Sequence, residues 1–135
     1  KKNIVKQNPA LVLSLHANGG FGRNASGFEL YYPGFKGVDV SKKAAKGSVV
    51  TPSNKHLNDT VKLAHLVQRN LDSLFPRKGR GLREAVVPLA DGLSIPVLVV
   101  ELGFATNPDD KKKLASGKTQ TLIARALAKS IKSFF

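Results

Sequence analysis

The sequence predicts an α/β fold with a mainly parallel sheet flanked by helices on both faces. Two apolar runs, Ala10–His16 and Pro96–Glu101, are typical of buried strands, and each is followed closely by glycine. Apolar residues recur every three or four positions over 54–75 and 119–134, which is typical of amphipathic helices. Strands that are separated by helices favour parallel pairing, so these observations together indicate the α/β class.

The remaining elements follow from local signals. Phe28–Tyr32 consists largely of strand-favouring residues, and Asn107-Pro108 predicts the start of a further helix because asparagine caps helices and proline suits their first turn. Residues 35–52 lack any period and are predicted to form a loop or an inserted lobe. Arg77–Gly81 is predicted to be a basic loop, and Val86–Leu89 a short strand.

Length and composition limit the classes of protein that the chain can represent. The 135 residues are expected to form a single domain over 1–135. The absence of cysteine excludes disulfides and a thiol nucleophile, and no apolar run reaches the length of a membrane span. The absence of methionine indicates a processed chain or a fragment. A net charge of +13 predicts attraction to a polyanion.

Two ionisable side chains stand at the ends of the two clearest strands, His16 and Glu101. Ligands in open α/β sheets bind beyond the carboxyl ends of the strands, so the pair is a candidate active site. Its natural chemistry is a metal-bound histidine beside a carboxylate that acts as general base. The alternative for His16 is a hydrogen-bonded structural histidine.

Four ordered blocks identify a resemblance to a known family. The blocks are Ser14–Asn18, Gly27–Tyr32, Arg80–Ala85 and Val100–Pro108, the last with the pattern Glu-Leu-Gly-Phe-x-Thr-Asn-Pro. With these blocks the sequence resembles the zinc-dependent N-acetylmuramoyl-L-alanine amidases of bacterial cell walls over essentially its whole length.

The resemblance implies an activity and a set of site residues. The family hydrolyses the amide between N-acetylmuramic acid and the L-alanine of the stem peptide, with Zn²⁺ as cofactor. His16 matches a zinc ligand and Glu101 matches the catalytic acid/base, while Asn18 and Arg83 are expected to contact the substrate. The partner implied is peptidoglycan, in a periplasmic or extracellular setting at the cell wall.

The sequence also departs from the family. Two further zinc ligands, a histidine and a glutamate, are expected upstream of His16, yet the fifteen preceding residues contain no His, Asp or Glu. We therefore expect the chain to be the C-terminal part of a catalytic domain, incomplete at its N-terminus, with its other ligands coming from a segment that could act in trans. None of His56, His65, Glu29 and Asp39 has a spacing that argues for a metal. The polypeptide alone is expected to bind zinc weakly or not at all.

Two other functions remain open at this stage. The chain could be a non-catalytic peptidoglycan-binding fragment or degenerate relative, because substrate affinity can outlast the loss of a metal. The charge alone would also fit a basic nucleic-acid-binding domain. Nucleic acid is not the expected partner, because the basic residues are spread along the chain and no nucleic-acid-binding motif is present.

Overall fold

The computed structural model describes residues 2–34 and 54–135, with side chains described over 2–34 and 56–135. The expected lobe over 35–52, Asp39 and the cap of the helix near residue 54 lie outside this description. In chain order the described elements are α1 (Lys2–Gln7), β1 (Val12–Asn18), β2 (Phe28–Pro33), α2 (Asn54–Leu74), β3 (Gly79–Ala85), β4 (Val97–Phe104), α3 (Pro108–Ala115) and α4 (Gly117–Phe134).

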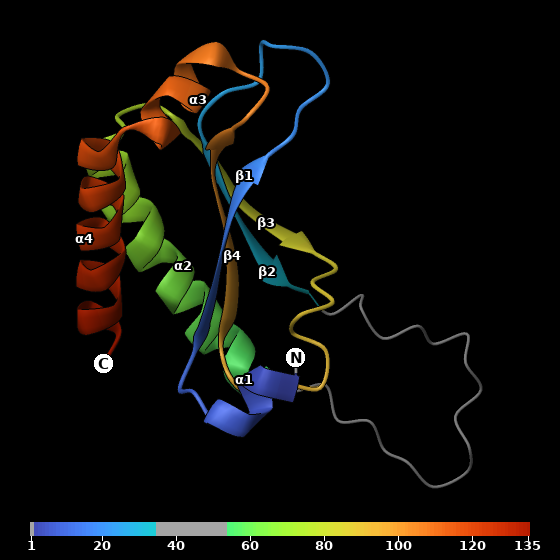
Figure 1. The fold of residues 1–135 in the computed structure, drawn as a ribbon. Helices are drawn as coiled ribbons and strands as arrows, with labels where there is room; N and C mark the ends of the chain where they lie inside the picture. The colour runs from blue at the N-terminus through green and yellow to red at the C-terminus, as the bar shows by residue number, and fades with distance from the viewer. Residues whose placement is uncertain (1, 35–53) are drawn as a thin grey trace, which may run out of the picture.

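The strands form one mixed sheet in the order β1-β4-β2-β3. β1 pairs with β4 in parallel and β2 pairs with β3 in parallel, whereas β2 and β4 run antiparallel. The predicted α/β class and the mainly parallel sheet are confirmed, but the expectation of helices on both faces is not met among the described elements. Helices α2 and α4 lie together on one face of the sheet, and the carboxyl ends of β1 and β4 point toward α3 (Figure 1). No helix in the described part of the chain has the length and apolar character needed to cross a membrane.

The core lies between the sheet and α2, with α4 packed behind. Alternate residues of β2 and β4 point toward α2, because neighbouring side chains in a strand face opposite sides of the sheet. The helices are joined inside this layer by a hydrogen bond from the Asn70 amide to the Ser130 hydroxyl, 2.8 Å long. The buried core residues are Phe28, Leu30, Leu63, Ala64, Val67, Leu71, Leu98, Val100, Ile123 and Leu127.

The local signals for α2, β4 and the start of α3 are confirmed. Asn107 caps α3, since its side-chain oxygen accepts hydrogen bonds from the backbone N–H groups of Asp109 and Asp110 at 3.0 and 3.1 Å. The following Pro108 occupies the first turn, where a missing N–H costs nothing. The cap therefore fixes where the chain turns after β4.

Three local expectations are wrong. β1 was expected to be buried on both faces, but none of its residues is buried, because it is an edge strand whose only described strand neighbour is β4. The segment Arg77–Gly81 is not wholly a loop, since β3 begins at Gly79 through its pairing with β2. Val86–Leu89 lies outside the strands, which leaves β3 as the strand of this region. The short helix α1 was not expected.

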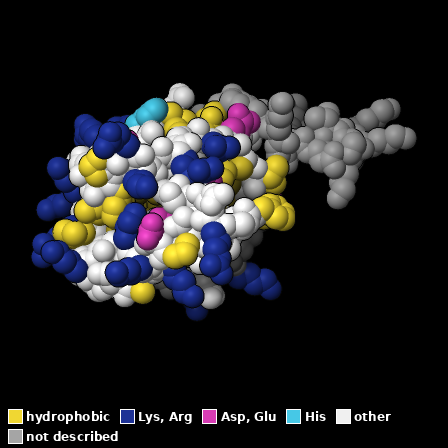
Figure 2. Space-filling model, turned by 90° about the horizontal axis from the view of Figure 1, so that it is seen from above, with side chains coloured by type: hydrophobic (Ala, Val, Ile, Leu, Met, Phe, Trp, Pro, Cys, Tyr) yellow, Lys and Arg dark blue, Asp and Glu magenta, His cyan; other side chains and the backbone are white. Residues whose placement is uncertain are grey.

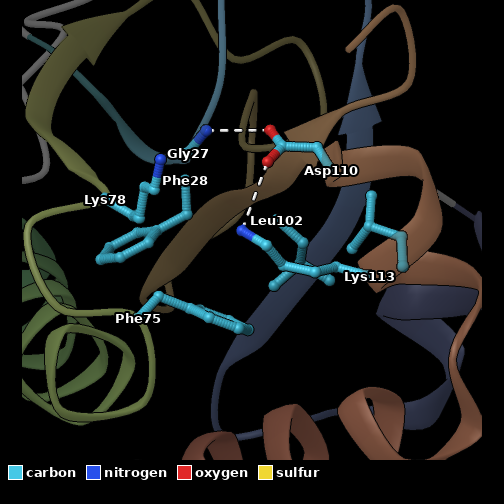
Figure 3. A pocket seen from close by; sticks show the side chains of 8 residues that line it. Gly27, Phe28, Phe75, Lys78, Leu102, Asp110 and Lys113 are labelled. Carbon is cyan, nitrogen blue, oxygen red and sulfur yellow. Dashed lines mark hydrogen bonds and ion pairs between the residues drawn. The ribbon is translucent and has the colours of Figure 1, made fainter. Parts of the chain in front are cut away.

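A buried carboxylate connects the loop before β2 to the end of β4. The Oδ2 atom of Asp110 accepts hydrogen bonds from the backbone N–H groups of Gly27 and Phe104, both at 2.9 Å. Its other oxygen lies 3.6 Å from the Lys113 ammonium. Figure 3 shows the contacts of Asp110 with Gly27 and Lys113 at a small pocket that Phe75 also lines. The pocket belongs to the framework, since it contains neither His16 nor Glu101.

We predict that Gly27→Ala destabilises the fold. Gly27 has φ +100°, and a Cβ there would collide with the carbonyl oxygen of Lys78. Backbone strain of this kind costs about 1–3 kcal/mol, and the collision adds to it. The measurement is the free energy of unfolding in urea. Gly117→Ala is the matched control, since a Cβ at this helical position meets nothing within 4 Å. The control should be neutral or stabilising, and an equal loss in both variants would contradict the prediction.

Candidate functional site

The two residues that end the predicted strands are direct neighbours. His16 of β1 pairs with Glu101 of β4 in the parallel register. Both strands point toward the same end of the sheet, which is the arrangement that the sequence predicted for a candidate site. The structure thus brings the predicted histidine and carboxylate together.

A second carboxylate flanks Glu101 from the other side. Glu29 of β2 is the antiparallel register partner of Glu101, and the next pair along the strands is Leu30 with Val100. Leu30 and Val100 are buried in the core under α2. Because side chains alternate along a strand, Glu29 and Glu101 lie on the opposite face of the sheet, away from α2.

Glu29 is the centre of a polar cluster. Its side chain is nearly buried, with a residue exposure of 4%. One carboxylate oxygen lies 2.6 Å from the Arg80 Nε and 3.7 Å from an Arg83 Nη. The other accepts hydrogen bonds from the Tyr31 hydroxyl at 2.5 Å and from the Asn18 amide at 3.5 Å. We call Glu29, Tyr31, Arg80, Arg83 and Asn18 the Glu29 cluster.

These contacts shift the acidity of Glu29 and Tyr31. Burial alone raises the pKa of Glu29, but the hydrogen bonds from Tyr31 and Arg80 and the charges of Arg80 and Arg83 outweigh it, so the pKa is lowered. The hydrogen bond to Glu29, aided by burial, raises the pKa of Tyr31. Glu29 is therefore held charged while Tyr31 is held neutral.

Glu101 has the opposite environment. Burial raises its pKa, the charge of His16 lowers it, and the charge of Glu29 raises it again, with a net upward shift. Among the described side chains, its Oε2 is the buried polar atom without a hydrogen-bond partner. A buried carboxylate oxygen without a donor is costly, and such groups occur where a ligand or a proton is handled.

His16 is exposed, and its ring is hydrogen-bonded to a residue of the same strand. The Ser14 hydroxyl lies 2.7 Å from the His16 Nε2, two residues earlier on the same face of β1. The loop that follows is fixed to the loop after β4, because the backbone N–H of Gly20 donates to the Thr106 hydroxyl at 3.2 Å. The loop after β1 is thus attached to the loop after β4, beyond His16 and Glu101.

The four residues predicted for the site come from β1, β3 and β4, and sequence reasoning missed Glu29, the residue that contacts two of them. Asn18 and Arg83 both contact Glu29 rather than Glu101. Glu29 was not predicted as a site residue because its spacing does not argue for a metal, although it alternates with the apolar Phe28 and Leu30 along β2. That alternation was the available signal, since the same side of the sheet carries Glu101. Tyr31 and Arg80 were not predicted.

The described residues do not make a zinc site on their own. A catalytic zinc needs about three protein ligands with an open position for water. No group of three His, Cys, Asp or Glu side chains that could hold a metal occurs in residues 2–34 and 56–135. The carboxylate of Glu29 is paired with Arg80 and Arg83. His56 and His65 both belong to α2, which lies on the other face of the sheet. His16 is therefore the single imidazole at the site.

The surface at this end of the molecule is basic. Figure 2 shows lysine and arginine side chains spread over the face seen from above, with few acidic side chains among them. The Arg80 guanidinium carbon lies 5.1 Å from the centre of the Phe104 ring, which holds one of these cations beside the end of β4. Such a face attracts anionic polymers, both cell-wall and nucleic-acid ones.

Comparison with known proteins gives a consistent result. The family model described as N-acetylmuramoyl-L-alanine amidase matches residues 1–133. A cell wall amidase of Bacillus anthracis is 29% identical over 125 residues, which cover 93% of this chain and 21% of the relative. A Bacillus subtilis protein, YqiI, is 28% identical over 125 residues, which cover 93% of this chain and 51% of that protein. The chain thus spans from about a fifth to about half of these relatives.

Solved structures show the same fold. An N-acetylmuramoyl-L-alanine amidase of Nostoc punctiforme superposes with a TM-score of 0.75 at 24% identity, covering 98% of this chain and 62% of the other. The catalytic domain of the amidase CwlV from Paenibacillus polymyxa gives a TM-score of 0.75 at 16% identity, with 98% and 62% covered. At these identities the likeness establishes the fold alone.

We predict that Glu29 makes the fold sensitive to acid. Because its pKa is lowered by folding, its contribution to stability is present above the unfolded pKa and is lost as the pH falls through the folded pKa. The free energy of unfolding of the unmodified chain should therefore fall more steeply on acidification below about pH 4.5, the usual glutamate value, than that of Glu29→Gln. Urea unfolding at a series of pH values measures this. Parallel curves for the two proteins would contradict it.

Proposed function

Because the chain belongs to the N-acetylmuramoyl-L-alanine amidase family, we propose that it hydrolyses the amide between N-acetylmuramic acid and the L-alanine of the peptidoglycan stem peptide. The observation that carries the proposal is the buried, unpartnered oxygen of Glu101 beside His16. A non-catalytic wall-binding role would give no reason for this costly arrangement.

In the proposed mechanism Glu101 moves the proton. A carboxylate acts best as a base and then as an acid when its pKa is raised toward the working pH, and burial raises the pKa of Glu101. Its free Oε2 accepts a proton from the attacking water and returns it to the departing amine of L-alanine. The amide C–N bond breaks, and a carboxylic acid and a free amine result.

Asn18 and Arg83 are the proposed substrate contacts. Arg83 has a side-chain exposure of 55%, and one of its Nη atoms lies 3.7 Å from Glu29. A guanidinium carries five N–H donors, so the others remain available to a substrate. It suits the carboxylates of a stem peptide or other anionic groups of the wall. The proposed setting is the cell wall, in a periplasmic or extracellular location.

Zinc dependence is proposed for this activity with His16 as the ligand supplied by the described residues. His16 would hold a zinc ion there, and such an ion would supply polarisation of the scissile carbonyl and of a water molecule. Since the described residues do not complete a site, the remaining ligands are proposed to come from a further segment or a second chain.

We predict that Glu101→Gln abolishes hydrolysis without weakening the fold. Loss of a general acid/base costs about 10²–10⁴-fold in rate. A raised carboxyl pKa means that the charged form opposes folding at neutral pH, so the amide should unfold at an equal or higher temperature. The assay is mass-spectrometric detection of stem peptides released from purified peptidoglycan in excess zinc, since excess metal offsets weak affinity.

The exposed carboxylate of Asp59, on α2, gives a matched control with the same loss of charge. Asp59→Asn should keep the rate of the unmodified chain. Full activity in Glu101→Gln would refute the role of Glu101. A folded chain that releases no peptide in excess zinc, even when the segment that supplies the remaining ligands is added, would refute the amidase proposal and favour a non-catalytic wall-binding protein.

We predict that the purified 135-residue chain retains much less than one zinc per molecule, because it supplies one imidazole to the site. Residual binding, measured by calorimetry with zinc alone, should disappear in His16→Ala and persist in His65→Ala. Metal analysis together with intact mass decides the matter. A stoichiometric zinc at the mass of the isolated chain would mean that other residues complete the site.

A further inference from the structure

Two carboxylates meet on one face of the sheet, and their partners differ completely. Glu101 leaves an oxygen without any donor among the described residues. Glu29, its register partner, has both oxygens occupied. The donors come from β1, β2 and β3, and they are Asn18, Tyr31, Arg80 and Arg83. A carboxylate that is saturated in this way has no free position for a metal or a reacting proton.

We infer that Glu29 is a positioning residue, which fixes Asn18 and Arg83 beside Glu101 for binding of the wall substrate. The inference rests on the proposed function, since it concerns the same substrate and the same face. Glu29 acts through its neighbours, because its own exposure is only 4%. The side chains that it holds are the ones that reach solvent, with Arg83 exposed by 55%.

The geometry of Arg80 supports this role. Its Nε is directed at Glu29, 2.6 Å away, while its guanidinium rests over the Phe104 ring at the end of β4. Arg83 approaches the same oxygen of Glu29 at 3.7 Å. Two cations that converge on one oxygen repel each other once the anion between them is removed. Loss of the Glu29 charge should therefore release Arg83 from its place beside Glu29.

Charge gives the test its direction. The change Glu29→Gln removes one negative charge, so the formal net charge rises from +13 by one. If the chain holds anionic peptidoglycan only through its overall charge, the variant should bind as well or more tightly. If Glu29 positions the contacts, the variant should bind more weakly, by about tenfold, as when an outer partner of a site is removed.

The experiment measures cosedimentation with purified peptidoglycan at several salt concentrations. The proteins are the unmodified chain, Glu29→Gln, Arg83→Ala, the double variant and Asp59→Asn. The last removes one negative charge, as Glu29→Gln does, but from α2. We expect Glu29→Gln and Arg83→Ala each to weaken binding and the double variant to be no weaker than either, because one residue acts through the other. Asp59→Asn should bind like the unmodified chain.

A spectroscopic measurement separates positioning from loss of fold. The chain has two tyrosines and no tryptophan, so Tyr32→Phe leaves Tyr31 as the sole source of tyrosinate absorbance. In that background the pKa of Tyr31 should fall when Glu29→Gln is added, since the hydrogen bond to Glu29 raises it. The variant must still show a cooperative thermal transition.

Tyr31→Phe replaces Glu29→Gln if the latter does not fold. It removes one hydrogen bond to Glu29 but keeps the Glu29 charge and its contact with Arg80. We then expect Tyr31→Phe to bind peptidoglycan more weakly than the unmodified chain.

The outcomes are distinct. Equal binding by Glu29→Gln and Asp59→Asn overturns the inference and leaves the amidase proposal intact. Strictly additive losses in the double variant also overturn it, because Glu29 would then not act through Arg83. An unmodified chain that does not bind peptidoglycan at any salt concentration overturns both proposals. Binding without any hydrolysis refutes the amidase activity alone.

Discussion

The position of β4 between a parallel neighbour and an antiparallel neighbour determines everything on the polar face of the sheet. Its register with β1 brings His16 to Glu101, and its register with β2 brings Glu29 to the same residue. Side chains alternate along strands, so a slip of one residue in either pairing would turn one of these groups into the core. The apolar packing of Leu30 and Val100 against α2 opposes that slip. The core thereby sets the geometry of the site on the other face.

That arrangement places two acidic groups side by side on the polar face of the sheet, and their charged forms are stabilised unequally. Glu29 is stabilised as an anion, because arginines and a tyrosine hydroxyl replace the water that it loses. Glu101 has no such donors, and the neighbouring Glu29 charge adds to its burial in raising the pKa. Pairs of titratable groups whose environments move their pKa values apart are the usual arrangement of acid/base sites. The charged form of Glu101 therefore lowers the stability of the fold, whereas the charged form of Glu29 does not.

Local signals made much of the fold predictable, and the misses have a common cause. Asn107-Pro108 carries its own capping chemistry, and the periodicity of α2 is long, so both could be read from nearby residues. β3 could not, because Gly79-Arg80-Gly81 favours a turn by itself and becomes a strand through pairing with β2. The adjacency of His16 and Glu101 followed from strand ends. The Glu29 cluster did not, since its members come from three strands whose order the sequence leaves open.

The shape of the site bears on the kind of substrate it can accept. Figure 3 shows a small pocket that Asp110 lines, but it belongs to the framework, and the candidate residues His16 and Glu101 do not line it. His16 is exposed, as are Arg80 and Arg83, while Glu101 and Glu29 lie deeper between them. A glycan strand with attached peptides is too long to enter a closed cavity, whereas it can lie across an open strand edge. The exposed Arg80 and Arg83 beside the recessed Glu29, with Glu101 next to it, therefore fit the open site that the proposed cleavage of a polymer needs.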